Sequence, residues 1–123
     1  MDEVRLTLPV EPRFAPVANL VVGGLGSRLE LTVDGLEDLQ LAIDSLFHRG
    51  RSGGDVTIAM RLENGSLVTD MGPFPADTLR RELAEERAGD LGLRRILDTV
   101  MDGIETRDGS GGTWITLRKR LER

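Results

Sequence analysis

The chain has one histidine, His48, and it follows Asp44 by four residues. Residues four apart share one face of a helix, so the pair could serve as a general base with its partner or as two metal ligands. Two ligands alone do not make a metal site, and a polar helix edge without chemistry gives the same spacing. Because the chain has no second imidazole and no cysteine, a serine triad would depend on His48, and thiol chemistry is excluded. The sequence therefore assigns no catalytic residue, and Asp44 is the candidate if the chain is an enzyme.

Two glycine-containing segments offer binding chemistry. In the first, Asp70 precedes Gly72 at the end of a predicted strand; its carboxylate could accept a proton from an exocyclic amine while the glycine lets a flat ring approach the backbone. In the second, Gly89, Leu91 and Gly92 lead into a predicted helix, whose free amides and dipole could hold phosphate oxygens. An ordinary turn and an ordinary helix cap are the alternative interpretations.

Hydrophobic periodicity predicts the elements that must position these residues. We expect strands at residues 4–8, 56–62, 66–70, 104–107 and 113–117, and helices at 13–29, 34–50 and 91–101. Residues 76–87 are expected to form either an exposed charged helix or a mobile cover. Asn64-Gly65 predicts a tight hairpin, Asp34 or Gly35 is expected to cap the second helix, and the glycine and prolines at 72–75 are expected to end the strand before them. Hairpins separated by helices favour a two-layer α/β sandwich with a mixed, mostly antiparallel sheet covered on one face by helices.

Composition limits the classes of protein. A length of 123 residues fits a single domain, 1–123. The 16 basic and 21 acidic residues give a net charge of −5, which disfavours direct binding of nucleic acid. The N-terminus has no signal-peptide pattern, and no apolar run approaches the ~20 residues that span a bilayer. A cytoplasmic location without a membrane segment is the expectation.

Five segments together carry a resemblance to a known family. They are an LTLP opening, an LAIDS helix, a hairpin that ends in DMGP, the stretch GDLGLRRILD and a final GGTWITLRKRL strand. In this order the chain resembles the GHKL (histidine kinase-like ATPase) superfamily, and within it the anti-sigma regulatory factors that are also serine kinases. The resemblance implies ATP and magnesium as cofactors, a sigma factor or an STAS-type antagonist as the protein partner, and a possible homodimer.

The resemblance also assigns roles to residues. The family's acid in the first glycine box contacts the adenine amine and corresponds to Asp70, with Gly72 beside it. Gly89, Leu91 and Gly92 form the second box, whose amides approach the phosphates.

The second helix and the first glycine box depart from the family pattern. Where the family has a glutamate base this chain has Ser45, and the helical turn that carries the family's magnesium-binding asparagine is missing. Phe74 stands where the family has a second glycine, so its side chain would crowd the same space. Without an organised cation, phosphoryl transfer loses its main charge stabilisation.

Three functions remain open at this point. The first is an anti-sigma-type regulator that acts by binding a protein, with ATP binding and kinase activity weakened or lost. The second is an active ATP-dependent serine/threonine protein kinase in which Asp44 replaces the base. The third is a sensor that binds ATP without hydrolysing it. In addition, the alternation of Val4, Leu6 and Leu8 offers a strand that could serve a homodimer or simply pack in the sheet.

Overall fold

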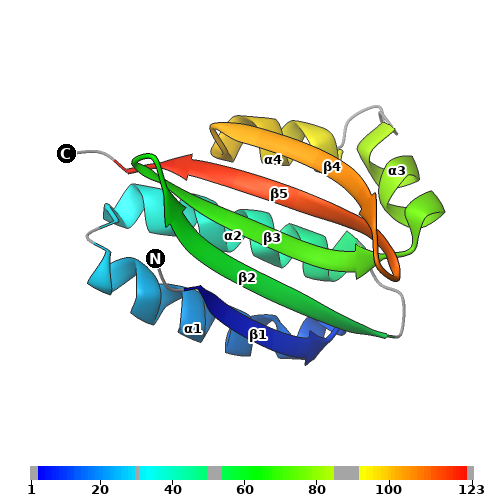
Figure 1. Cartoon of the computed structure of the whole chain (residues 1–123), viewed down its shortest axis with the longest axis horizontal. Coiled ribbons are helices and arrows are strands. Elements are labelled where there is room, and N and C mark those ends of the chain that lie inside the picture. Colours follow the sequence, from blue (N-terminus) through cyan, green and yellow to red (C-terminus); the bar gives the residue numbers. More distant parts are fainter. Residues whose placement is uncertain (1–2, 30, 50–53, 85–91, 122–123) are drawn as a thin grey trace.

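A computed structural model describes residues 3–29, 31–49, 54–84 and 92–121. A five-stranded antiparallel sheet, in the order β1-β2-β3-β5-β4, carries the helices on one face (Figure 1). The two-layer α/β architecture predicted from the sequence is confirmed. The elements, in chain order, are β1 (Val4–Pro9), the short 3₁₀ helix η1 (Pro12–Phe14), α1 (Ala15–Arg28), α2 (Val33–Arg49), β2 (Asp55–Glu63), β3 (Ser66–Phe74), α3 (Ala76–Ala84), α4 (Leu93–Val100), β4 (Gly103–Gly109) and β5 (Gly112–Arg120).

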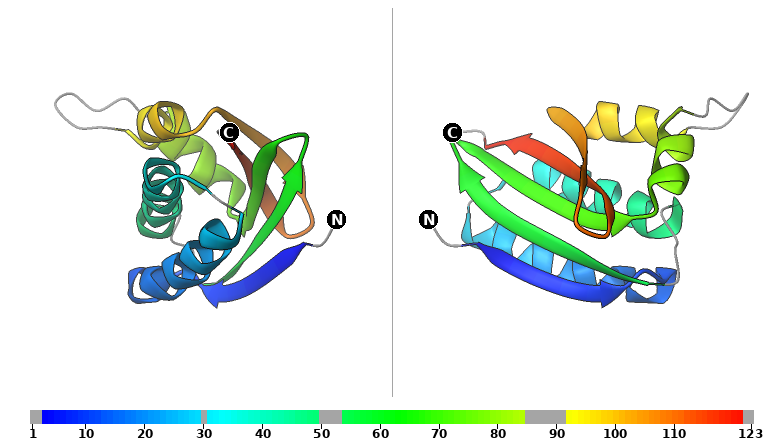
Figure 2. Two further views of the ribbon diagram at one scale, coloured as in Figure 1. Left: turned by 90° about the vertical axis from the view of Figure 1, so that its left-hand side faces the viewer. Right: turned by 45° about the vertical axis from the view of Figure 1, so that its right-hand side comes forward.

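The core lies between the sheet and the helices. Figure 2 shows α1, α2 and α4 side by side on the covered face, with α3 at one end of the sheet. The central helix, α2, buries most of its apolar stripe, as its 3.6-residue periodicity predicts. The fully buried residues are Leu39, Ile43, Leu46 and Phe47, and Leu36 is partly buried. Strand residues with side chains on the same side of the sheet complete the core, among them Ile58, Met71 and Leu117. None of the helices in the described ranges is long and apolar enough to cross a membrane.

The two hairpins form where the turn residues predict them. Asn64 and Gly65 have positive φ angles of 51° and 79°, as a tight type I′ turn requires, and Glu63 pairs with Ser66 directly beside it. The second hairpin closes with Gly109 opposite Gly112. These turns set the register and thereby decide which side chains face the helices.

Two local expectations were wrong. Strand β3 does not end at Asp70 but continues to Phe74, because an irregularity in its pairing with β5, between Met71 and Phe74, accommodates Pro73. Helix α2 begins at Val33, and its cap is neither Asp34 nor Gly35: the Gly35 amide donates to Thr32 Oγ1 at 3.0 Å. Helix α1 does not break at its glycines, and a Cβ at Gly26 would lie only 2.9 Å from Leu36 Cδ1, so that glycine permits close packing on α2.

Two predicted helices reach into a part of the chain that the structure does not describe. Helix α3 is described to Ala84 and α4 begins at Leu93. The rest of the ranges predicted for them, between residues 85 and 91, lies outside the described residues.

Lys119, the one lysine of the chain, joins three elements. Its side chain points from β5 toward the helix layer and is only 14% exposed. Its Nζ donates to Asp38 Oδ2 of α2 at 2.9 Å and to the carbonyl oxygen of Val100, the last residue of α4, at 2.8 Å. The cation therefore neutralises a carboxylate and also meets the negative end of a helix.

Candidate functional site

The space between α2 and the end of β3 is where the resemblance implies a nucleotide. Leu46 and Phe47 of α2 and Phe74 of β3 are each 0% exposed and belong to one continuous apolar core. These three side chains offer no carboxylate or amide for magnesium, which prefers oxygen ligands in an octahedral arrangement. These three side chains therefore cannot themselves hold a magnesium ion.

Asp70, the candidate adenine ligand, lies on the other face of the sheet. Along β3 the side chains alternate: Thr69 and Met71 face the helices, whereas Asp70 points away from them. Its Oδ2 accepts a hydrogen bond from Arg61 Nη1 at 2.7 Å, and its Oδ1 accepts one from Thr116 Oγ1 at 2.6 Å. Both carboxylate oxygens are thus engaged by neighbouring strands, and the assignment to adenine remains an untested prediction.

The electrostatics of the Asp70–Arg61 pair favour the ionised forms of both side chains. Burial by itself raises the pKa of Asp70, but the hydrogen bonds from Thr116 and Arg61 together with the arginine charge outweigh it, so the pKa lies below its ordinary value. The hydrogen bond to Asp70 in turn raises the pKa of Arg61 against the effect of desolvation. The guanidinium also contacts Glu63 at 3.0 Å. This cluster has the properties of a structural charge network on an open sheet face.

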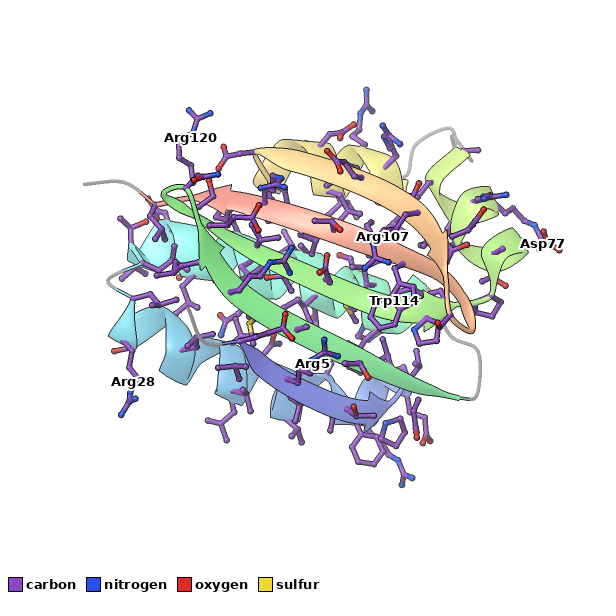
Figure 3. All side chains as sticks on the ribbon, viewed as in Figure 1. Arg5, Arg28, Asp77, Arg107, Trp114 and Arg120 are labelled. Atoms are coloured by element: carbon purple, nitrogen blue, oxygen red, sulfur yellow. The ribbon has the colours of Figure 1, made fainter. Side chains whose placement is uncertain are left out.

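Gly72 packs directly against a tryptophan. A Cβ at this position would lie 2.7 Å from Cδ2 of Trp114, on the neighbouring strand β5, so the indole can rest against the sheet only over a glycine. The ring is held by a hydrogen bond from its Nε1 to the Ser110 carbonyl at 3.2 Å and by the Arg107 guanidinium, 5.5 Å from the ring centroid. Figure 3 shows Trp114 and Arg107 on the sheet face opposite the helices.

The candidate catalytic pair does not form as a side-chain pair. His48 Nδ1 makes its hydrogen bond, 2.8 Å long, with the main-chain carbonyl of Asp44 and not with the carboxylate. Both residues lie on the side of α2 that faces away from the sheet, opposite the buried stripe. Ser45, at the position of the family's glutamate, is half-buried. No cluster of three or more metal-ligating side chains occurs in residues 3–29, 31–49, 54–84 and 92–121.

The second glycine segment is described only in part. Gly89 and Leu91 lie outside the described residues. Gly92 is the residue before α4, with an extended backbone (φ −68°, ψ 159°), and its carbonyl accepts the Ile96 amide at 3.1 Å. The helix begins directly after Gly92, two residues after the predicted start, so of the residues whose amides the resemblance assigns to phosphate only Gly92 is described.

Helix α3 is fixed over the end of the sheet by an apolar anchor and an ion pair. Leu79 is fully buried in the core. Arg80 Nη2 lies 2.7 and 2.8 Å from the two carboxylate oxygens of Asp108 on β4, and Thr113 Oγ1 donates to the same carboxylate at 3.1 Å. The segment that the sequence left open as a charged helix or a cover is, up to Ala84, a docked helix.

Sequence reasoning missed the partners on the open sheet face. Alternation along the last strand could have placed Trp114 and Thr116 on one side. Nothing in the sequence alone gives the strand order, however, and the strand order is what brings Thr116 and Arg61 to Asp70 from β5 and β2.

No protein-family model matches the chain, but individual relatives do. The chain is 28% identical over 140 residues to the serine-protein kinase RsbW of Halalkalibacterium halodurans, covering 99% of this chain and 85% of the relative. It is 26% identical over 148 residues to the RsbW of Bacillus pumilus, with 100% and 88% covered. For the RsbW of Listeria innocua the identity is 27% over 124 residues, with 85% and 78% covered.

A solved structure shares the fold. It is the crystal structure of the RsbU and RsbW domains of Rv1364c from Mycobacterium tuberculosis, with a TM-score of 0.71 and 16% identity. The alignment covers 100% of this chain and 33% of that longer one. The predicted resemblance is confirmed: over nearly its whole length the chain is similar to the RsbW-type serine-protein kinases, the anti-sigma-factor type of the GHKL superfamily.

Proposed function

We propose that the chain is an anti-sigma-factor-like regulator that acts by binding a protein partner, with ATP binding and kinase activity weakened or lost. The proposed weakening or loss of ATP binding rests on one observation: the space between α2 and β3 is filled by the apolar side chains of Leu46, Phe47 and Phe74. A triphosphate with its magnesium ion needs charged and polar ligands there. The proposed role as a protein-binding regulator is supported by the similarity to RsbW-type proteins.

The position of Asp70 supports the same proposal. A carboxylate that recognises an adenine amine must point toward the base. Here both oxygens accept hydrogen bonds from Arg61 and Thr116 on the open sheet face. Recruiting Asp70 for a nucleotide on the helix side would require these contacts to break.

A thermal-shift measurement tests the loss of nucleotide binding. A ligand present at 100 times its Kd stabilises the native state by about 2.7 kcal/mol, which raises the Tm of a domain of this size by roughly 10 °C. We expect no shift with millimolar ATP and magnesium. A clear shift would contradict the proposal, and an Asp70→Ala variant would then show whether the adenine contact lies where the resemblance implies.

Partner binding is tested with purified proteins. By the family resemblance, the partner is a sigma factor or an STAS-type antagonist in the cytoplasm. Titration calorimetry with the sigma factors and STAS proteins of the source genome is expected to yield at least one complex. If none forms under conditions in which an RsbW relative binds its own partner, the regulator proposal fails.

An active kinase is the second candidate, because the relatives are named serine-protein kinases. In that case Asp44 would act as the base. Transfer of labelled phosphate from ATP to an STAS partner, abolished by Asp44→Asn, would establish this function. A rise in Tm with ATP without any phosphate transfer would instead favour the ATP-binding sensor.

A homodimer through the edge strand β1 is tested by sedimentation with the same protein.

A further inference from the structure

Helix α1 is apolar on its exposed side as well as on its buried side. Residues 15–27 contain no charged side chain, although 30% of the chain is charged. Five large apolar side chains are exposed in the part of the chain that the structure describes, and four of them belong to α1 and α2. They are Val17 (43% exposed), Leu20 (78%), Val33 (71%) and Leu41 (48%). Exposed apolar groups scattered singly are normal, but their concentration on two adjacent helices indicates an interaction surface.

The two helices bring these side chains to one side of the molecule. Gln40 Nε2 of α2 donates to the Asn19 carbonyl of α1 at 3.2 Å, which fixes the contact between the helices. Leu20 and Leu41 are the next residues along each helix, one step of about 100° further round, and both turn toward solvent. The outer sides of α1 and α2 face away from the sheet (Figure 2). We call Val17, Leu20, Val33, Glu37, Leu41 and Asp44 the α1–α2 face.

Unpaired acids border Leu41 on this face. Glu37 precedes it by four residues and Asp44 follows it by three, so all three lie in one row on α2. Neither Glu37 nor Asp44 has a side-chain ion pair or hydrogen bond within the described residues, whereas Asp38, on the adjacent side of the helix, is bound by Lys119. The α1–α2 face therefore combines apolar contacts with uncompensated negative charge.

We propose that the α1–α2 face docks a basic amphipathic helix of a partner protein. A row of apolar residues on the partner would cover Leu20 and Leu41, and flanking lysine or arginine side chains would pair with Glu37 and Asp44. An anionic membrane is a poorer occupant, because the unpaired carboxylates would repel its headgroups. This inference rests on the proposed function, since it names the surface with which the regulator holds its partner.

The test uses the full chain and two defined probes in titration calorimetry. One is a helical peptide of ~14 leucines and lysines in amphipathic order, and the other has glutamate in place of lysine. We expect the leucine/lysine peptide to bind about tenfold more tightly than the leucine/glutamate peptide. The double variant Leu20→Ser/Leu41→Ser is expected to weaken its binding by about tenfold or more. Val4→Ser removes an exposed apolar side chain of β1 and is the matched control, with unchanged affinity.

A charge reversal tests the acidic part separately. Glu37→Lys/Asp44→Lys should move the preference from the lysine peptide to the glutamate peptide, whereas Glu105→Lys on β4 should leave it unchanged. Equal binding of both peptides to the unmodified chain, no binding of either, or affinity that is insensitive to these variants would each overturn the inference. All substituted positions are at least partly exposed, so folding is checked by unchanged Tm values.

The outcomes separate this inference from the proposed function. If a sigma factor or STAS protein binds and the double serine variant binds it equally well, the α1–α2 face is wrong and the regulator proposal stands. If the lysine peptide binds as expected and no sigma factor or STAS protein does, the face stands and the proposed function fails. A concentration-dependent dimer that the serine variant abolishes would assign the face to a second copy and overturn the inference.

Discussion

Replacing Gly72 by alanine tests whether this glycine serves the tryptophan or a ligand. The new Cβ would lie 2.7, 2.9 and 3.0 Å from three carbon atoms of the Trp114 indole, where ordinary contacts need at least about 3.4 Å. The ring must therefore move, which disturbs its hydrogen bond to Ser110 and its stacking with Arg107. Losing these interactions costs about 1 kcal/mol each, and the lower chain entropy of alanine offsets about 0.5 to 1 kcal/mol.

The net expectation is a loss of about 1 to 1.5 kcal/mol in the free energy of unfolding, a fall of roughly 1 M in the urea midpoint. Urea unfolding followed by circular dichroism measures it in two backgrounds. When Trp114 is already alanine, Gly72→Ala should cost less than about 0.5 kcal/mol, because the obstacle is gone. Gly24→Ala, where a Cβ meets nothing within 4 Å, is the control and should be neutral or stabilising. Equal losses in both backgrounds would refute the packing argument.

Three further substitutions test the remaining polar contacts by urea unfolding. Asp70→Asn should lower stability by about 1 kcal/mol at pH 7. Because the folded-state pKa of Asp70 lies below the ordinary 3.8, its contribution to stability is present above pH 3.8 and is lost as the pH falls through the folded-state pKa. A stability difference between the unmodified chain and the variant that stays constant down to pH 3 would contradict this prediction. Thr69→Val removes a buried hydroxyl that has no hydrogen-bond partner among the described residues and should raise stability by about 1 kcal/mol. Destabilisation would mean that the hydroxyl has a partner. Lys119→Met keeps the aliphatic stem but leaves the carboxylate of Asp38 and a helix-terminal carbonyl unpaired, so it should cost about 1 to 2 kcal/mol, and an unchanged midpoint would show that the buried cation contributes nothing.

Local sequence signals predicted most of the fold. The Asn64-Gly65 turn and the apolar periodicity of α2 depend on residues close together in the chain, so a single sequence carries them. The position of Asp70 does not. A one-residue irregularity or a different strand order changes which face a strand residue occupies, and Asp70 meets its partners only through contacts 9 and 46 residues away in the chain.

The same limit applies to the candidate site. The sequence indicated that Phe74 would crowd the space of the family's second glycine, and the structure places it in the core. The sequence contains no sign that Gly72 accommodates Trp114, because that contact joins two strands about 40 residues apart. The predicted pair of Asp44 and His48 shares a helix side as expected, yet spacing alone cannot decide whether two side chains bond to each other or to the backbone.

The position of Trp114 gives the molecule an intrinsic optical reporter. It is the one tryptophan of the chain and the chain has no tyrosine, so its fluorescence emission reflects only the solvent-facing side of β3, β4 and β5. A partner without tryptophan or tyrosine that binds across that surface should shift the emission, and one that binds the outer side of α1 and α2 should leave it unchanged. A spectrum recorded during titration therefore distinguishes the two faces before any variant is made.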